Sequence, residues 1–268
     1  RRDDQSLSET ECSAQCAADL EALIEAEGAD TIAAFVAEPV IGTGGIIPPP
    51  EGYWPAISAV LKKHDILLIA DEVVTGFGRL GEMFASPHFG LEPDIMTIAK
   101  GLTSAYAPLS GSIISEKLWK VLERGNDELG PMGHGWTYSA HPVGAAAGVA
   151  NLKVLDDLGL IANAAESGPY LTQGLRDAVA DHPHVGEVRG IGMLSSVEMV
   201  ADRESRAMFE PDQKVLPRVL AAMGKRGVIA RAMPMSDTIG FAPPLCLSRD
   251  EADTIVSVTQ DVIAEVLG

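Results

Sequence analysis

Three short apolar runs in the first half of the chain most constrain its fold: TIAAFVA at 31–37, ILLIA at 66–70 and IMTIA at 95–99. Each run is continuous rather than alternating, and helical or Gly- and Pro-rich segments separate the runs. Strands that are buried on both faces of a parallel sheet have this pattern. The segment at 53–65, YWPAISAVLKKHD, is amphipathic and long enough for a crossover helix between two such strands. The runs therefore predict an α/β layered domain with a mostly parallel sheet, to which SGSIIS at 110–115 adds another strand.

The second half of the chain has a different pattern. Two long helical stretches rich in Ala and Leu lead into it, at 141–159 and 162–182. Two β-like segments around a pair of glycines follow at 185–200, then a helix at 211–226, short strands at 227–230 and 237–242, and a last helix. Because strands and helices do not alternate strictly here, the pattern favours a small α+β domain.

Two helices are predicted to begin at capping boxes. Ser8 is followed three residues later by Glu11 at the start of a helical pattern over 8–27, and Ser248 is followed by Glu251 in the same way. In a capping box the two side chains satisfy two backbone N–H groups that have no partner inside the helix. These serines therefore mark the starts of the first and last helices.

A charged residue ends each of the three apolar runs. Glu38 follows the first run, Asp71 follows the second and Lys100 follows the third. Ligands of open parallel sheets bind outside the carboxyl ends of the strands, so these three side chains are expected to face one crevice if their strands are neighbours.

Composition narrows the choice of partner. The formal net charge of −18 argues against nucleic acid or an anionic membrane surface and leaves small molecules or other protein chains. With no run near the roughly 18 apolar residues of a membrane span and no secretory signal pattern, we expect a cytoplasmic protein. The three cysteines are too few for a disulfide framework, and Cys12 and Cys16 lack further ligands that would complete a metal site. We expect no metal.

Two interpretations of Lys100 are open at this point. Beside carboxylates, the lysine either forms an ordinary ion pair and stays protonated, or acts as a nucleophile that forms a Schiff base with a carbonyl group. In the second case pyridoxal phosphate supplies a cation for the acids, because its ring nitrogen is protonated when an acid holds it. Asp71 fits that partner, and Val73 is placed to pack against the ring.

The stretch that contains these residues resembles the signature of the class III aminotransferases, which are pyridoxal-phosphate enzymes of fold type I. It reads LLIADEVVTGFGRLGEMFASPHFGLEPDIMTIAKGLTSAYAPL. The similarity continues through AAFVAEPVIGTGGIIPPPEGYW, HGWTYSAHPVGAAAGVANL and GVIARAMPMSDTIGFAPPL. Within the family, the chain most resembles the omega-aminotransferases that use pyruvate as amino acceptor. The resemblance implies a large cofactor-binding domain whose C-terminal part is residues 1–157, followed by a small C-terminal domain at 158–268.

The resemblance also implies roles for individual residues. Lys100 would form the Schiff base with pyridoxal 5'-phosphate and move the proton between substrate and cofactor. Asp71 would hold the pyridine nitrogen, Val73 would lie against the ring face, and Glu38 would lie on the side of the phenolic oxygen.

Two further residues match the family outside that stretch. Thr137 matches the threonine that reaches the cofactor phosphate of the neighbouring subunit in a homodimer, and its alternative is a hydroxyl that caps the following helix. Arg231 matches the mobile arginine that pairs with a substrate carboxylate, and its alternative is a surface arginine at a strand end. Trp136 and Tyr106 are more typical of core packing than of a substrate pocket.

The resemblance also shows what this stretch of sequence lacks. The Gly- and Ser-rich turn that grips phosphate in the family lies upstream of the matching region, and GTGG at 42–45 leads into prolines instead of a helix. We expect a C-terminal portion, either a fragment or one of two polypeptides that assemble. The implied reaction transfers an amino group from an amine or omega-amino acid to pyruvate or a similar keto acid. The alternatives are an aminomutase, a diamine- or ornithine-type transaminase, and a non-catalytic assembly module.

Overall fold

The computed structural model describes residues 6–131 and 133–268, and it divides into two compact units. The first unit comprises the residues up to Pro39, Pro49–Gly76 and Phe84–Val154. The second comprises Val40–Pro48, Phe77–Met83 and Leu155–Gly268. Two short segments thus leave the first half of the chain to join the second unit. The expected division into family domains at residues 157 and 158 stays a prediction.

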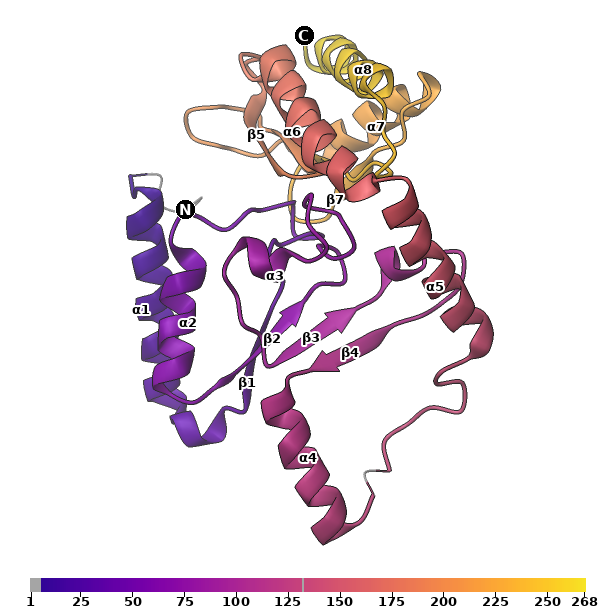
Figure 1. Cartoon of the computed structure of the whole chain (residues 1–268). Helices are drawn as coiled ribbons and strands as arrows, with labels where there is room; N and C mark the ends of the chain where they lie inside the picture. The colour runs from indigo at the N-terminus through magenta and orange to yellow at the C-terminus, as the bar shows by residue number, and fades with distance from the viewer. Residues whose placement is uncertain (1–5, 132) are drawn as a thin grey trace. The chain divides into compact units, whose positions relative to one another are not determined.

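The first unit is built on a four-stranded sheet in the order β1-β2-β3-β4 (Figure 1). The strands are β1 (Ala34–Ala37), β2 (Leu67–Asp71), β3 (Ile95–Ile98) and β4 (Gly111–Ile114). The pairs β1–β2 and β2–β3 are parallel, whereas β4 runs antiparallel to β3. The three apolar runs are therefore confirmed as adjacent parallel strands, and the fourth predicted strand is confirmed as the antiparallel edge.

Helices α1 (Glu9–Glu27) and α2 (Tyr53–Lys63) lie side by side against one face of this sheet (Figure 1). The capping box at Ser8 and Glu11 is present, so α1 begins where the sequence predicts. Trp54, Ile57 and Leu61 on α2 pack with Ile24 of α1 and Leu68 of β2 in one buried cluster. Apolar residues at these spacings give each helix a single core-facing stripe.

The expectation that these strands are buried on both faces is wrong for the described residues. Leu68 and Ala70 of β2 are buried, but no residue of β1, β3 or β4 is, and the side chain of Val36 is 63% exposed. The physical reason is that α1 and α2 cover only the face of the sheet that carries Leu68. The apolar residues on the opposite face are partly exposed, because no described element covers that face fully.

Four further short or unpredicted elements complete the first unit. Helix α4 (Glu116–Leu129) begins at Ser115, whose hydroxyl accepts from the N–H of Leu118. The others are α3 (Ala85–His88) and the 3-10 turns η1 (Ala29–Thr31) and η2 (Lys100–Leu102). Helix α5 (Pro142–Asp157) follows and continues across the boundary into the second unit.

The second unit contains an antiparallel sheet in the order β5-β6-β8-β7. Its strands are β5 (Val185–Ile191), β6 (Leu194–Met199), β7 (Arg231–Met233) and β8 (Thr238–Phe241). Its helices are α6 (Leu160–Val179), the 3-10 turn η3 (Pro211–Gln213), α7 (Val215–Lys225) and α8 (Arg249–Leu267), and α8 begins at the predicted capping box. The strand predicted at 227–230 is wrong in position. The chain turns after α7 at Gly227, whose φ is +83°, and strand pairing with β8 begins only at Arg231.

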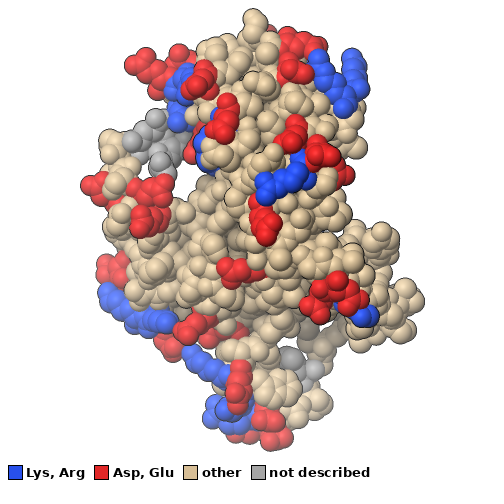
Figure 2. All heavy atoms as spheres, turned by 45° about the horizontal axis from the view of Figure 1, so that its top comes forward, with Lys and Arg blue, Asp and Glu red and all other residues tan. Residues whose placement is uncertain are grey.

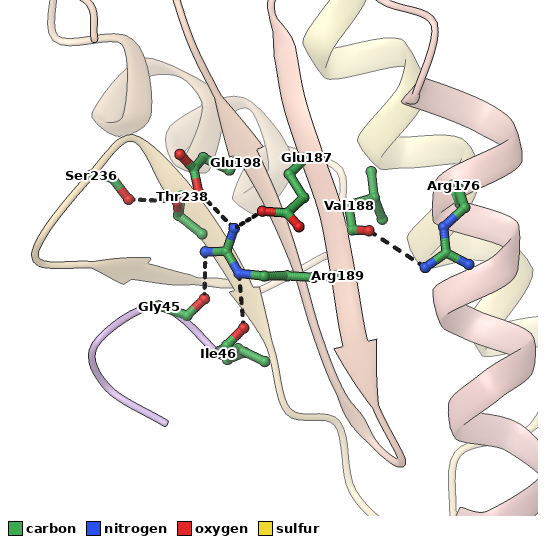
Figure 3. A network of polar contacts seen from close by, with 9 residues as sticks. All are labelled: Gly45, Ile46, Arg176, Glu187, Val188, Arg189, Glu198, Ser236 and Thr238. Atoms are coloured by element: carbon green, nitrogen blue, oxygen red, sulfur yellow. Dashed lines mark hydrogen bonds and ion pairs between the residues drawn. The ribbon is translucent and has the colours of Figure 1, made fainter. Parts of the chain in front are cut away.

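A partly buried arginine connects the segment 40–48 to this second sheet (Figure 3). Arg189 on β5 donates to the carbonyls of Ile46 (Nε–O 2.9 Å) and Gly45 (Nη2–O 2.8 Å). Its Nη1 pairs with Glu198 on β6 at 2.6 Å and with Glu187 at 3.2 Å. The guanidinium spreads its donors in a planar fork, which suits this combination of carboxylates and carbonyls.

The segment 77–83 is held in the same unit by a second arginine. Arg79 donates from Nη1 to the carbonyl of Pro243 at 2.6 Å, and the N–H of Met193 donates to the carbonyl of Arg79 at 2.9 Å. Burial lowers the pKa of Arg79. Gly192 is required here, because a Cβ at its position would lie 2.4 Å from the Cα of Leu80.

The surface of the chain carries the acidic excess of the sequence. On the face drawn in Figure 2, basic side chains stand in small groups among acidic ones instead of forming a broad basic area. None of the helices in the described part of the chain is both long and apolar enough to cross a membrane.

Candidate active site

The three charged residues predicted from the strand ends lie at one edge of the first sheet. Glu38 follows β1 directly, Asp71 is the last residue of β2, and Lys100 stands two residues after β3. Since β1, β2 and β3 are adjacent and parallel, their carboxyl ends meet at the same edge. The three side chains are expected to meet only if their strands are neighbours, and the sheet order shows that they are.

The carboxylate of Asp71 is oriented by two hydrogen bonds to one of its oxygens. Thr97 on β3 donates from its hydroxyl to Oδ1 at 3.0 Å, and the N–H of Val73 donates to the same atom at 3.0 Å. Asp71 and Thr97 are register partners in the β2–β3 ladder, so the ladder itself fixes this contact. In residues 6–131 and 133–268 no hydrogen bond reaches Oδ2, which leaves that oxygen to face a positively charged donor.

The turn after Asp71 is closed by a buried glutamate that the sequence reading missed. Glu72 is fully buried and accepts from the N–H groups of Ala85 (3.0 Å) and Ser86 (2.6 Å) and from the hydroxyl of Ser86 (2.7 Å). Thr75 donates its hydroxyl to the same carboxylate. Four donors compensate the burial of the charge, so Glu72 joins both ends of the loop that begins beside Asp71.

Lys100 is exposed and lies on an unusual backbone. Its φ is +38°, the left-handed region that residues with a Cβ enter at a cost of about 1–2 kcal/mol. Across the described chain its ammonium forms no ion pair and no hydrogen bond, although the sequence left an ordinary ion pair open as an interpretation. An unpaired amine on a strained residue at a strand end is typical of a functional position.

The segment that carries Thr137 is exposed. Trp136 and Tyr106 are 76% and 89% exposed, so the expectation that they pack in the core is wrong for the described residues. The alternative that Thr137 caps the next helix is also wrong, because the N–H of Val143 at the start of α5 bonds Nδ1 of His141 at 3.3 Å instead. The Thr137 hydroxyl makes no hydrogen bond to the part of the chain that the structure describes.

Arg231 begins β7, the edge strand of the second sheet, and its side chain is exposed. It belongs to the second unit, whereas Glu38, Asp71, Val73, Lys100 and Thr137 belong to the first. Four of the predicted cofactor-binding residues therefore lie at one edge of the first sheet or in the turns that follow it: Glu38, Asp71, Val73 and Lys100. Arg231 lies in the other unit.

The residues at this edge fit pyridoxal phosphate. Asp71 offers a carboxylate oxygen with no bond to the described chain, as a protonated ring nitrogen requires, and Lys100 offers an amine without a partner. Val73 is half-buried next to Asp71, and Glu38 is half-buried at the end of β1. No group of three potential metal ligands occurs among the described residues.

The chain matches the family described as Aminotransferase class-III over residues 2–263. It is 57% identical over 260 residues to a diaminobutyrate–2-oxoglutarate transaminase of Halomonas elongata, covering 97% of this chain and 55% of the relative. It is 41% identical over 255 residues to a putrescine–pyruvate aminotransferase of Pseudomonas aeruginosa, covering 95% of this chain and 54% of the relative.

A solved structure agrees with these sequence matches. The (S)-enantioselective omega-transaminase of Thermomicrobium roseum superposes with a TM-score of 0.93 at 45% identity, covering 98% of this chain and 58% of that chain. The present chain thus spans little more than half the length of the relatives it matches, and it corresponds to their C-terminal part. With the family matched along nearly all its length, this chain belongs to the class III aminotransferases.

Proposed function

We propose that this chain is the C-terminal part of a pyridoxal-phosphate-dependent aminotransferase that passes an amino group from an amine or omega-amino acid to a keto acid. The observation that carries the proposal is the placement of Asp71 and Lys100 at the carboxyl ends of two adjacent parallel strands. Asp71 offers a carboxylate whose Oδ1 is hydrogen-bonded and whose Oδ2 has no partner in the described chain. Lys100 offers an amine without a partner there.

Each residue at the sheet edge has a task in this reaction. The Oδ2 atom of Asp71 would accept a hydrogen bond from the protonated ring nitrogen, Val73 would support the ring face, and Glu38 would border the phenolic oxygen. When bound, the cofactor would draw electron density from the substrate carbon. The Nζ atom of Lys100 would hold the cofactor covalently and then carry the proton to and from that carbon.

The identity of the donor is drawn from the relatives. Diaminobutyrate and putrescine, which appear in the names of the two relatives, both carry a terminal amine. A donor with a primary amine away from any carboxylate fits both names, and this favours a diamine-type transaminase as the second candidate. For the acceptor, pyruvate is proposed from the name of the putrescine–pyruvate relative, and 2-oxoglutarate, from the name of the diaminobutyrate relative, is its competitor.

Arg231 is proposed to recognise the acceptor. Its planar guanidinium suits a carboxylate, and its exposed position at an edge strand leaves it free to swing aside for an uncharged amine. On this proposal Arg231→Ala lowers kcat/KM for keto acids and leaves the uncharged amine half-reaction within about twofold, whereas equal loss on both would contradict it.

The complete site is proposed to need more than this chain. Thr137, exposed and without a bonded partner in the described chain, is proposed to reach the cofactor phosphate in a second subunit. The remaining phosphate contacts are proposed to come from the upstream part that the relatives possess, either in the same polypeptide or in a separate one.

A chimera tests the function. The upstream part of the Halomonas elongata relative is fused to this chain, and amino transfer from a diamine is measured with pyruvate and with 2-oxoglutarate. Transfer that is lost in Lys100→Ala supports an aminotransferase, and the preferred acceptor then distinguishes pyruvate from 2-oxoglutarate. Migration of the amino group within one substrate would indicate an aminomutase. Absence of both reactions in a folded, dimeric chimera would support a non-catalytic assembly module instead.

A further inference from the structure

The turn that carries Lys100 is held in a strained conformation. Three residues with side chains adopt positive φ there: Lys100 at +38°, Ser104 at +48° and Ala105 at +65°. Two short backbone bonds stabilise it from inside, from the N–H of Leu102 to Ala99 and from that of Thr103 to Lys100. Such a conformation persists only when surrounding contacts determine it.

One side chain outside the turn supplies these contacts. Asn151 on α5 donates from Nδ2 to the carbonyls of Gly101 at 2.8 Å and Leu102 at 3.2 Å. Its Oδ1 accepts from the hydroxyl of Ser104 at 2.7 Å. An amide has two N–H donors and one carbonyl oxygen, so both ends of the Asn151 side chain are bonded to this single turn.

The sequence of α5 brings Asn151 within reach of the turn. Gly144 and Gly148 precede it by seven and three residues, so the three lie on one face of the helix. A Cβ on Gly144 would lie 3.1 Å from the carbonyl oxygen of Pro108, and one on Gly148 would lie 3.1 Å from Leu109. The two glycines therefore allow α5 to pack closely on the segment after Lys100, and the amide of Asn151 is the polar group at that contact.

We infer that Asn151 is a positioning residue for Lys100: its amide fixes the turn so that the lysine amine is presented toward the cofactor. The inference rests on the proposed function, because it assigns Asn151 to the covalent attachment of cofactor at Lys100. Asn151 touches neither the amine nor, on this inference, the cofactor. Its effect passes through the backbone of Gly101 and Leu102, which follow Lys100 directly.

The chain offers a matched control. Asn163 on α6 also donates from Nδ2 to two carbonyls, those of Leu245 at 2.6 Å and Leu247 at 3.1 Å, but it does so inside the second unit. Replacement of either asparagine by aspartate keeps the size of the side chain and places a carboxylate oxygen against two carbonyl oxygens. A general effect of that repulsion on folding would affect both variants.

The experiment uses the chimera with the upstream part of the Halomonas elongata relative. Three variants are compared with the unsubstituted chimera: Asn151→Asp, Ser104→Ala and Asn163→Asp. Each protein is loaded with the same amount of bound pyridoxal phosphate, reduced with borohydride and digested. Mass spectrometry then gives the fraction of the Lys100 peptide that carries the cofactor. We expect this fraction to fall in Asn151→Asp and less in Ser104→Ala, with kcat reduced roughly ten- to hundredfold and KM for the amine nearly unchanged. Asn163→Asp should match the unsubstituted protein.

The outcomes separate the two proposals. If the unsubstituted chimera carries no cofactor on Lys100, the proposed function fails whatever Asn151 does. If it carries cofactor and Asn151→Asp matches Asn163→Asp in both readouts, the positioning role is wrong. Should Asn151→Asp not fold, Ser104→Ala decides: an unchanged labelled fraction and kcat would overturn the inference.

Discussion

The hydroxyl of Thr97 donates to Oδ1 of Asp71 at 3.0 Å, across the register pair that joins β2 to β3. Strand β3 thus carries the residue that orients the carboxylate, and the lysine follows three positions later, just beyond the end of the strand. A slip of one residue in this pairing would turn Thr97 to the other face and remove the contact. The orientation of Asp71 and the placement of Lys100 therefore depend on one strand register.

Thr97→Val is predicted to weaken cofactor binding without unfolding the protein. Valine keeps the shape of threonine but removes the donor, so Oδ1 keeps only the N–H of Val73 and the carboxylate gains rotational freedom. The dissociation constant for pyridoxal phosphate in the chimera should rise, and the induced circular dichroism per bound cofactor should fall. Thr97→Ser should restore both. Thr172→Val, which removes a buried hydroxyl bonded to Ser195 at 2.6 Å, is the control and should change neither.

Removal of one partner from the buried pair Arg189–Glu198 is predicted to destabilise the second unit. The two side chains are 12% and 4% exposed and lie 2.6 Å apart, so Glu198→Gln leaves a buried guanidinium without its closest counter-charge. Because Glu187 and two carbonyls still contact the guanidinium, a loss of about 1–3 kcal/mol in the free energy of unfolding is expected from denaturant titration. The pair Lys62–Glu92 is exposed, and Glu92→Gln should change this free energy by about 1 kcal/mol or less. Similar losses in the two variants would contradict the role of burial.

Glu72→Gln is predicted to open the loop between Asp71 and α3. In the unsubstituted protein each carboxylate oxygen of Glu72 accepts from two donors. Glutamine replaces one of these oxygens by an NH2 group, so at least one buried donor loses its acceptor. An unfolding free energy lower by about 1–3 kcal/mol is expected for each such donor. Faster amide exchange at Ala85 and Ser86 would locate the change. Glu128→Gln on exposed α4 is the control, and protection of Ala85 and Ser86 equal to that in the control would refute the prediction.

The carboxyl group of Asp237 gives a prediction for pH. Burial raises the pKa of Asp237 above its ordinary value, and a backbone N–H from Leu216 opposes the shift in part. Because the folded pKa is higher than the unfolded one, the charged form destabilises the fold at neutral pH, and this penalty disappears as pH falls through the folded pKa toward the unfolded value. Asp237→Asn keeps the acceptor oxygen, so it should raise stability at pH 7 and lose that advantage at about pH 3, below the unfolded pKa. An advantage that stayed constant between these two pH values would contradict the assignment.

Much of the fold could be predicted from local patterns, since every strand except β7 and most helices follow from periodicity and caps. The positions of Asp71 and Lys100 at neighbouring strand ends followed from the same patterns together with the rule for parallel sheets. The partly exposed face of the first sheet could not be predicted. A continuous apolar strand shows that both of its faces are suited to burial, but it does not show which elements cover them.

The polar supports of the site were missed for a related reason. Thr97, Glu72 and Asn151 act through contacts with residues 26, 14 and about 50 positions away, and no spacing in the sequence marks such pairs. Two signals were available nonetheless. Glu72 is a charged residue directly after strand β2, and Asn151 shares a helix face with two glycines.

The central claim is that Lys100 binds pyridoxal phosphate covalently beside Asp71. The most direct measurement is the visible absorbance of the chimera after incubation with the cofactor and removal of the excess, in the unsubstituted protein and in Lys100→Ala, with Lys153→Ala on the exposed surface of α5 as the control. We predict a lysine-linked cofactor band that persists in Lys153→Ala and is absent in Lys100→Ala. An equal band in all three proteins, or none in a folded chimera, would contradict the account.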